Sequence, residues 1–135
     1  MKMITMEARI ENIEPITAFV GHELETINCP PRPQMQIIVA IDELISNIAN
    51  YAYAPGGGTV TVEFDYDEAD RTIMITFTDE GVPYDPLQHE EPDISLPAEK
   101  REIGGLGIHL VRKTMDDMKY RYENSKNILT IFKRI

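Results

Sequence analysis

The 135-residue sequence has no tryptophan and only one cysteine, Cys29. A single cysteine excludes an intramolecular disulfide and the zinc sites built from several cysteines, and it fits a reducing compartment. No apolar run approaches the roughly 20 residues that a membrane-spanning helix needs. The N-terminal segment also lacks the apolar stretch of a signal peptide. We therefore expect a cytoplasmic protein without a membrane partner.

Positive charge is scarce as well. The chain has 13 Lys and Arg residues against 23 Asp and Glu residues, which gives a net charge of -10. Lys and Arg side chains drive binding to phosphate backbones, so nucleic acid is not an expected partner. An acidic surface fits a partner with basic patches, but charge alone does not identify one. The length predicts one domain over residues 1–135 with its own hydrophobic core.

Hydrophobic periodicity predicts helices that alternate with β-hairpins. Apolar residues spaced three to four apart predict helices over 14–28 and 34–53, and a third from about 104 to 115. Strict alternation predicts a hairpin of strands 59–66 and 71–78, and a second of strands 118–123 and 127–133 around a turn at 124–127. A looser alternation over 2–10 is compatible with a short strand. Hairpins pair antiparallel, so we expect an α+β fold with helices on one sheet face.

The segment from 80 to 103 differs from the rest of the chain. It holds four of the nine prolines, is rich in acidic residues and has few large apolar residues. A segment of this length without periodicity is unusual inside a compact domain and is commonly functional. We interpret it as a lid-like loop, because too little sequence follows it to form a second domain.

The long predicted helix has a polar stripe opposite its apolar face. Glu43, Asn47 and Asn50 are spaced i, i+4, i+7 and therefore share one face of an α-helix. This stripe is either a solvated helix surface or a group of side chains that points into a cleft. In a cleft, the carboxylate could take a proton from an attacking hydroxyl, and an amide oxygen suits Mg²⁺.

Two further short motifs have both a structural and a functional interpretation. Asp79-Glu80-Gly81 follows a predicted strand and forms either a simple turn or a site where a carboxylate meets an exocyclic amine. Gly104-Gly105-Leu106-Gly107 opens a predicted helix and is either a hinge or a place where backbone N–H groups bind phosphate. No Gly-Lys-Ser/Thr follows these glycines, which excludes a Walker A loop.

Together, the three motifs resemble the signature of the GHKL ATPase superfamily. Residues 42–53, DELISNIANYAY, are similar to its N box, residues 79–83, DEGVP, to its adenine box, and residues 104–110, GGLGIHL, to its glycine box. The small anti-sigma-factor serine kinases of this superfamily are the most similar, and the resemblance covers roughly residues 5–134. It implies the Bergerat fold, a two-layer sandwich with helices on a mostly antiparallel sheet.

The resemblance also implies a role for individual residues. Glu43 would be the catalytic base, Asn47 a Mg²⁺ ligand at the nucleotide, and Asn50 a further nucleotide contact. Asp79 and Gly81 would hold adenine, with Thr130 assisting through water, and residues 84–103 would form the ATP lid. The phosphates would be bound by the glycine box: Gly104, Gly105, Leu106 and Gly107. The sequence differs from the family pattern at Pro83, where a second glycine is usual.

The implied function is an ATP- and Mg²⁺-dependent protein serine kinase. Its substrate would be a STAS-type anti-anti-sigma protein, its second partner a sigma factor or similar regulator, and its state a homodimer. Two alternatives remain open at this point: a regulatory module that binds nucleotide without phosphoryl transfer, and an interaction domain without nucleotide. The basic pair Lys100-Arg101 would either neutralise the γ-phosphate or be a solvated charge pair.

Overall fold

The computed structural model describes residues 1–53, 57–88 and 105–135. In this part of the chain, five strands form one sheet in the order β1-β2-β3-β5-β4, and every neighbouring pair is antiparallel. The strands are β1 (Lys2–Glu7), β2 (Thr59–Asp67), β3 (Thr72–Asp79), β4 (Asp117–Glu123) and β5 (Lys126–Arg134). The α-helices are α1 (Ile13–Thr26), α2 (Pro31–Asn47) and α3 (Gly105–Thr114). The described residues also form three short helices: η1 (Ile10–Asn12), η2 (Ile48–Ala52) and η3 (Pro86–Gln88).

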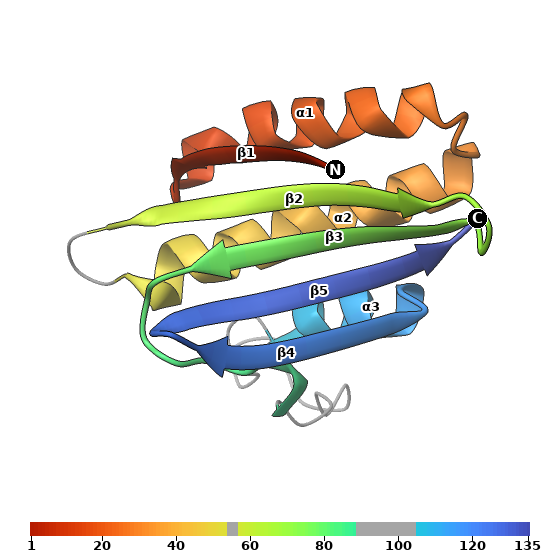
Figure 1. Cartoon of the computed structure of the whole chain (residues 1–135). Coiled ribbons are helices and arrows are strands. Elements are labelled where there is room, and N and C mark those ends of the chain that lie inside the picture. Colours follow the sequence, from red (N-terminus) through yellow and green to blue (C-terminus); the bar gives the residue numbers. More distant parts are fainter. Residues whose placement is uncertain (54–56, 89–104) are drawn as a thin grey trace.

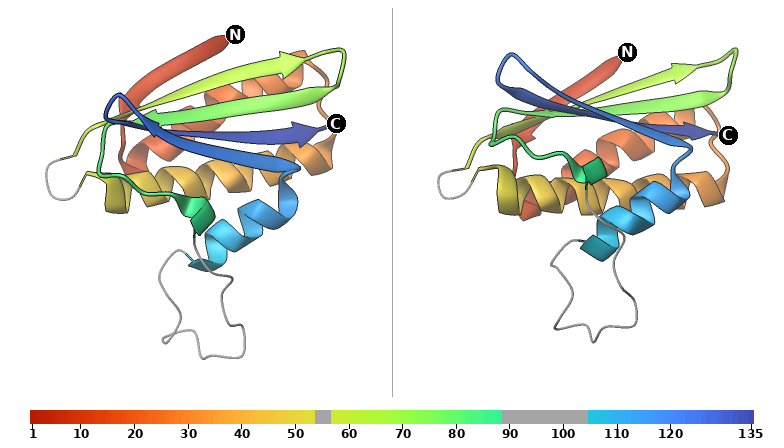
Figure 2. Two further views of the ribbon diagram at one scale, coloured as in Figure 1. Left: turned by 60° about the horizontal axis from the view of Figure 1, so that its bottom comes forward. Right: turned by 90° about the horizontal axis from the view of Figure 1, so that it is seen from below.

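The three α-helices lie on one face of the sheet and leave the other face uncovered (Figures 1 and 2). Helix α1 lies beside β1 and β2, α2 crosses behind the centre of the sheet, and α3 lies behind β5 and β4 (Figure 1). The predicted α+β class and the two-layer arrangement are therefore confirmed. No helix in the described ranges is long and apolar enough to cross a membrane.

The core fills the space between the two layers. Strand residues alternate between faces, and the residues that point toward the helices are buried: Val60, Val62, Phe64, Ile73, Ile75, Phe77, Leu129 and Ile131. Helix α2 meets them with Ile37, Ile41, Leu44 and Ile45, which follow the helical period. This packing brings the last turns of α2 close to Asp79, at the end of β3, and to Asn127, at the start of β5.

Several element boundaries differ from the sequence prediction. The helix expected over 34–53 begins at Pro31, because the first turn tolerates residues without an N–H. Its α-helical part ends at Asn47, and a π-helical turn, η2, follows. The turn expected at 124–127 is only Asn124-Ser125, both with positive φ (54° and 62°), as a two-residue type I′ turn requires. Asn127 therefore belongs to β5.

Candidate functional site

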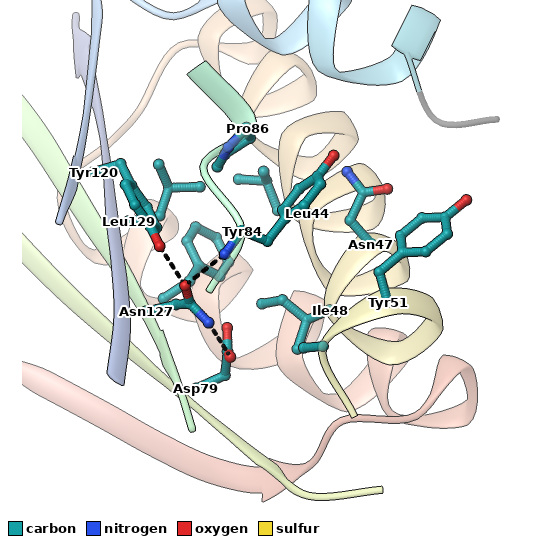
Figure 3. A pocket seen from close by; sticks show the side chains of 12 residues that line it. Leu44, Asn47, Ile48, Tyr51, Asp79, Tyr84, Pro86, Tyr120, Asn127 and Leu129 are labelled. Carbon is teal, nitrogen blue, oxygen red and sulfur yellow. Dashed lines mark hydrogen bonds between the residues drawn. The ribbon is translucent and has the colours of Figure 1, made fainter. Parts of the chain in front are cut away.

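A small apolar pocket lies between the C-terminal part of α2, η2 and the edge of the sheet formed by β3, β5 and β4 (Figure 3). Leu44, Ile48, Ala52, Phe77, Pro86 and Leu129 form its apolar walls. In the described part of the chain three polar side chains are buried, Asn47, Asp79 and Asn127, and all three line this pocket. Buried polar groups are costly, so their gathering at one cavity marks it as the candidate site.

Asp79, the last residue of β3, lies at the base of the pocket and is only 5% exposed. Its Oδ1 accepts hydrogen bonds from the Gly81 N–H and from Asn127 Nδ2, both at 2.9 Å. Burial raises the pKa of the Asp79 carboxyl, and these two hydrogen bonds oppose that rise. Oδ2 accepts no hydrogen bond from a described residue and points into the pocket (Figure 3). It is an acceptor positioned for a ligand's N–H group.

Gly81 turns the chain closely past the end of η2. A Cβ at this position would overlap the carbonyl oxygen of Ala52. That carbonyl accepts a 3.0 Å bond from the Val82 N–H, and Tyr53 Oη accepts a 2.5 Å bond from the Glu80 N–H. The segment after Asp79 is thus fastened to the helix layer, and a glycine at 81 is required for that approach.

Asn47, the last residue of α2, is buried at 8% exposure beside the pocket. Its Nδ2 has no hydrogen-bond partner among the described residues. An unpaired buried donor of this kind costs about 1–3 kcal/mol, so it fits a site that a ligand completes. The amide offers a donor to a phosphate oxygen, and its oxygen is a hard ligand suited to Mg²⁺. The residues present therefore fit the nucleotide and cation that the sequence predicts.

Glu43 lies one helical turn before Asn47 and is half-buried. Burial, and then the charge of Asp42, raise the pKa of its carboxyl, which favours proton uptake. A Cβ on Gly107, in the first turn of α3, would overlap Glu43 Oε2. The carboxylate therefore rests directly against the glycine box, although Glu43 does not itself line the apolar pocket.

Two further predicted site residues, Asn50 and Thr130, do not point into this pocket. Asn50 is exposed, because η2 is π-helical and shifts the i+7 position out of the line that Glu43 and Asn47 share. The pocket is lined by Tyr51 instead. Thr130 lies on the helix-free sheet face, where its hydroxyl pairs with Thr76 Oγ1 at 2.9 Å. Strand alternation gives the pocket Asn127 and Leu129, so the expected contact of Thr130 with adenine does not fit this geometry.

Several predicted features fall on residues that the structure leaves undescribed. Gly104, Lys100 and Arg101 lie outside the described residues, as does most of the lid predicted over 84–103. Gly105 and Leu106 begin α3, which confirms that a helix starts in the glycine box. Of the predicted lid, residues 84–88 are described: Tyr84 stacks on Tyr51 with ring centroids 6.4 Å apart, and both line the pocket.

Asn127 is the buried pocket residue that the sequence analysis missed. The sequence prediction places Asn127 in the turn at 124–127 and therefore does not assign it to either face of a strand. Its signal is present in the sequence, because Asn127 is in phase with the apolar residues Leu129 and Ile131 on the buried face of a strand. A polar residue in an apolar strand position is unusual and points to a buried hydrogen-bond network.

Comparison with protein-family models matches residues 6–133 to the histidine kinase-like ATPase domain. Among curated proteins, the chain is similar to the serine/threonine-protein kinase BtrW of Bordetella bronchiseptica, with 26% identity over 100 residues, covering 74% of this chain and 70% of BtrW. It is also similar to the serine-protein kinase RsbW of Bacillus cereus, with 30% identity over 95 residues, covering 67% of this chain. The chain spans 58% of the length of that RsbW.

Solved structures show the same fold at low identity. The crystal structure of RsbU and RsbW domains from Mycobacterium tuberculosis matches with a TM-score of 0.64 and 14% identity, covering 99% of this chain and 32% of that one. The SiaB–SiaC complex of Pseudomonas aeruginosa matches with a TM-score of 0.59 and 16% identity, covering 98% of this chain and 89% of the matched chain. The family match over nearly the whole chain, joined to the pocket geometry, assigns this protein to the histidine kinase-like (GHKL-type) ATPase family.

Proposed function

We propose that this protein is an ATP- and Mg²⁺-dependent serine kinase that phosphorylates a STAS-type anti-anti-sigma protein and also binds a sigma factor or similar regulator. The observation that carries the proposal is the gathering of Asn47, Asp79 and Asn127, the buried polar side chains of the described chain, around one apolar pocket. The similarity to BtrW and RsbW, which are named as protein kinases, supports it.

Adenine would enter the apolar pocket with its exocyclic amine toward Asp79. Oδ2 is the open acceptor, and the apolar walls suit the faces of a flat ring. The free volume is about 40 Å³, room for only a few water molecules. A base therefore enters only if side chains that line the pocket move, and the stacked rings of Tyr51 and Tyr84 form one side of it (Figure 3). Movement of Tyr84 would carry the first residues of the predicted lid with it.

The phosphates would extend from the pocket toward the first turn of α3. Backbone N–H groups at a helix N-terminus bind phosphate, and Gly107 brings this turn against Glu43. Asn47 would hold Mg²⁺, which supplies charge neutralisation for the phosphates when bound. Asn47 and Glu43 lie on neighbouring turns of α2, so the nucleotide contact and the acid–base group are held by one rigid element.

Glu43 would act as the general base of the transfer step. The serine Oγ attacks the γ-phosphorus, the bond from that phosphorus to the β–γ bridging oxygen breaks, and ADP leaves. The proton of the serine hydroxyl passes to the Glu43 carboxylate. A positioned base of this kind contributes roughly 10²–10⁴-fold, and the raised pKa of Glu43 makes it a stronger proton acceptor than an ordinary glutamate.

We also propose that the protein forms a homodimer through its uncovered sheet face. The β1–β2 half of this face carries the outward-pointing acids Glu7, Glu63 and Asp65, of which Glu7 pairs with Arg9. The β4–β5 half carries more bases than acids: Lys119, Arg121 and Lys126 point outward there, beside Glu123, which pairs with Arg121. Two copies related by a two-fold axis could place each acidic half on a basic half. Sedimentation should then show a dimer that weakens as salt rises.

The competing function is a regulatory module that binds ATP and a partner without transferring phosphate. The two are separated by following labelled γ-phosphate from ATP to the serine residues of purified STAS-domain proteins from the same genome. We expect transfer by the wild-type protein, loss of about 10²-fold or more in Glu43→Gln, and wild-type transfer in the control Glu25→Gln, an exposed acid on α1. ATP binding without transfer to any of these substrates would establish the non-catalytic module instead.

A further inference from the structure

The side-chain amide of Asn127 has every hydrogen-bonding position occupied. Nδ2 donates to Asp79 Oδ1 and to the Val82 carbonyl, both at 2.9 Å, with a longer 3.4 Å contact to the Gly81 carbonyl. Oδ1 accepts from the Tyr84 N–H at 3.1 Å and from Tyr120 Oη. An amide has two donor hydrogens and two acceptor lone pairs. Asn127 has none left for a ligand, so any role it has acts through its neighbours.

The partners of Asn127 come from three separate parts of the pocket. Asp79 is its direct cross-strand neighbour in the β3–β5 register. Val82 and Tyr84 belong to the segment that leads from Asp79 to the predicted lid, and Tyr120 lies on β4. Figure 3 shows Asn127 between Asp79 and Tyr120, with its amide plane bridging the two. One buried side chain thus joins the carboxylate at the base of the pocket to the backbone of the segment that leads to the predicted lid.

We propose that Asn127 is the positioning residue that gives the pocket its selectivity for an amino-purine base, because it fixes the orientation of Asp79. This inference deepens the proposed nucleotide-binding function and rests on it. By engaging Oδ1 together with the Gly81 N–H, Asn127 prevents rotation of the carboxylate and leaves Oδ2 as the acceptor in the pocket. A fixed acceptor receives the exocyclic amine of adenine and repels the carbonyl oxygen that hypoxanthine carries at the same ring position.

The same hydrogen bond keeps Asp79 ionised, which an acceptor requires. Burial favours the neutral acid, and the donors from Asn127 and Gly81 lower the pKa of Asp79 against that effect. The titratable groups around Asp79 are Tyr53 at the end of η2, Glu80 beside it and Tyr120 on β4. Burial raises the pKa of both tyrosines, so they remain neutral where Asp79 titrates. Removing the Asn127 donor should therefore move the Asp79 titration to higher pH.

The test compares two nucleotides that differ at one ring position. Calorimetry measures the dissociation constants of ATP and of ITP, which has a carbonyl in place of the amine, for wild type, Asn127→Leu and Asn127→Ala. Both substitutions remove the amide that donates to Asp79, and neither places a new charge or a new donor beside the carboxylate. The control is Asn124→Gly, an exposed turn residue of the same hairpin whose positive φ suits glycine.

We expect the wild type and Asn124→Gly to prefer ATP, and the ATP-over-ITP ratio to fall about tenfold or more in both Asn127 variants. In Asn127→Leu, the loss of ATP affinity on acidification should begin at a higher pH than in wild type. A purely structural role would weaken ATP and ITP equally and leave the ratio unchanged, and that result would overturn the inference. If Asn127→Leu does not fold, the ratio in Asn127→Ala decides. A wild-type protein that binds ATP and ITP equally also overturns it, whereas one that binds neither overturns the proposed function and this inference with it.

Discussion

Substitution of Gly107 by alanine tests whether a glycine is required at this position so that the Glu43 carboxylate can pack against α3. The added Cβ would overlap Glu43 Oε2 and lie 2.5 Å from Cδ and 3.2 Å from Cγ. Carbon atoms in contact are about 3.5–4.0 Å apart. The carboxylate must therefore move by about 1 Å or more, and a misplacement of that size at a reacting group costs about 10²-fold in rate.

The effect of Gly107→Ala on stability should be much smaller than its effect on rate. The overlapping atoms belong to the end of a flexible, half-buried side chain, and a rotation of about 30° off its rotamer costs about 0.5–1.5 kcal/mol. Alanine is more favourable than glycine within a helix by roughly 1 kcal/mol. The two effects largely offset each other, so the unfolding temperature should shift by only a few degrees.

The assay measures labelled phosphate transfer, ATP affinity and thermal unfolding for each variant. Gly21→Ala is the matched control, because Gly21 lies within α1 and a Cβ there meets no atom within 4 Å. We expect Gly21→Ala to transfer phosphate at the wild-type rate. In a Glu43→Ala background, Gly107→Ala should cause no further loss of rate, because the carboxylate that the new Cβ would displace is absent. A folded Gly107→Ala variant with wild-type affinity and wild-type rate would refute the reasoning.

Three further predictions follow from the buried polar groups and from the second close-packed glycine. Gly81→Ala should destabilise the protein by about 1–3 kcal/mol, because its Cβ would overlap backbone atoms of Ala52 that cannot swing aside; a melting curve like that of wild type would contradict this. Asn47→Ala should reduce the Mg²⁺-dependent part of ATP affinity and the transfer rate together, as titrations with and without Mg²⁺ would show. If ATP affinity falls equally with and without Mg²⁺, Asn47 is not the metal ligand. Burial raises the pKa of Asp79, so ATP affinity should fall as the pH drops through that raised pKa. The contribution of Asp79 to the stability of the nucleotide-free protein has the opposite sign: it is greatest below the ordinary pKa of aspartate and declines as the pH rises, because the folded state holds the proton more tightly. Calorimetric titrations and chemical denaturation across pH would check both signs.

The fold was predictable because nearly every element follows one simple period. Strict alternation in β2 and β3 predicts a hairpin, and its inward residues Ile73, Ile75 and Phe77 are buried as expected. The pattern of α2, from Ile37 through Ile45, predicts the helix that packs on them. These periods follow from the local backbone geometry of helices and strands, so the spacing of apolar residues in the sequence reveals them directly.

The candidate site was predictable only where such a period continued. Glu43 and Asn47 share the line expected of an α-helix, but η2 breaks the helical period before Asn50. On β5, the two-residue turn Asn124-Ser125 sets which residues face the helices, so Thr130 points outward and Asn127 inward. A π-helical turn and a hairpin register are set by packing across the whole molecule. A one-residue shift of the register exchanges the two faces of a strand, and one extra residue in a helical turn rotates the following side chains by about 100°.

The central claim, that the pocket above Asp79 binds the adenine of ATP, is tested most directly by calorimetric titration of ATP into wild type and Asp79→Asn. The substitution keeps the shape of the side chain but replaces an ionised acceptor with an amide, whose donor can face the adenine amine. We expect saturable binding to wild type, and binding to Asp79→Asn weaker by about 1.5–3 kcal/mol, the contribution of one hydrogen bond to a charged group. Wild-type protein that binds no ATP, or an Asp79→Asn variant that binds it with unchanged affinity, would contradict the account.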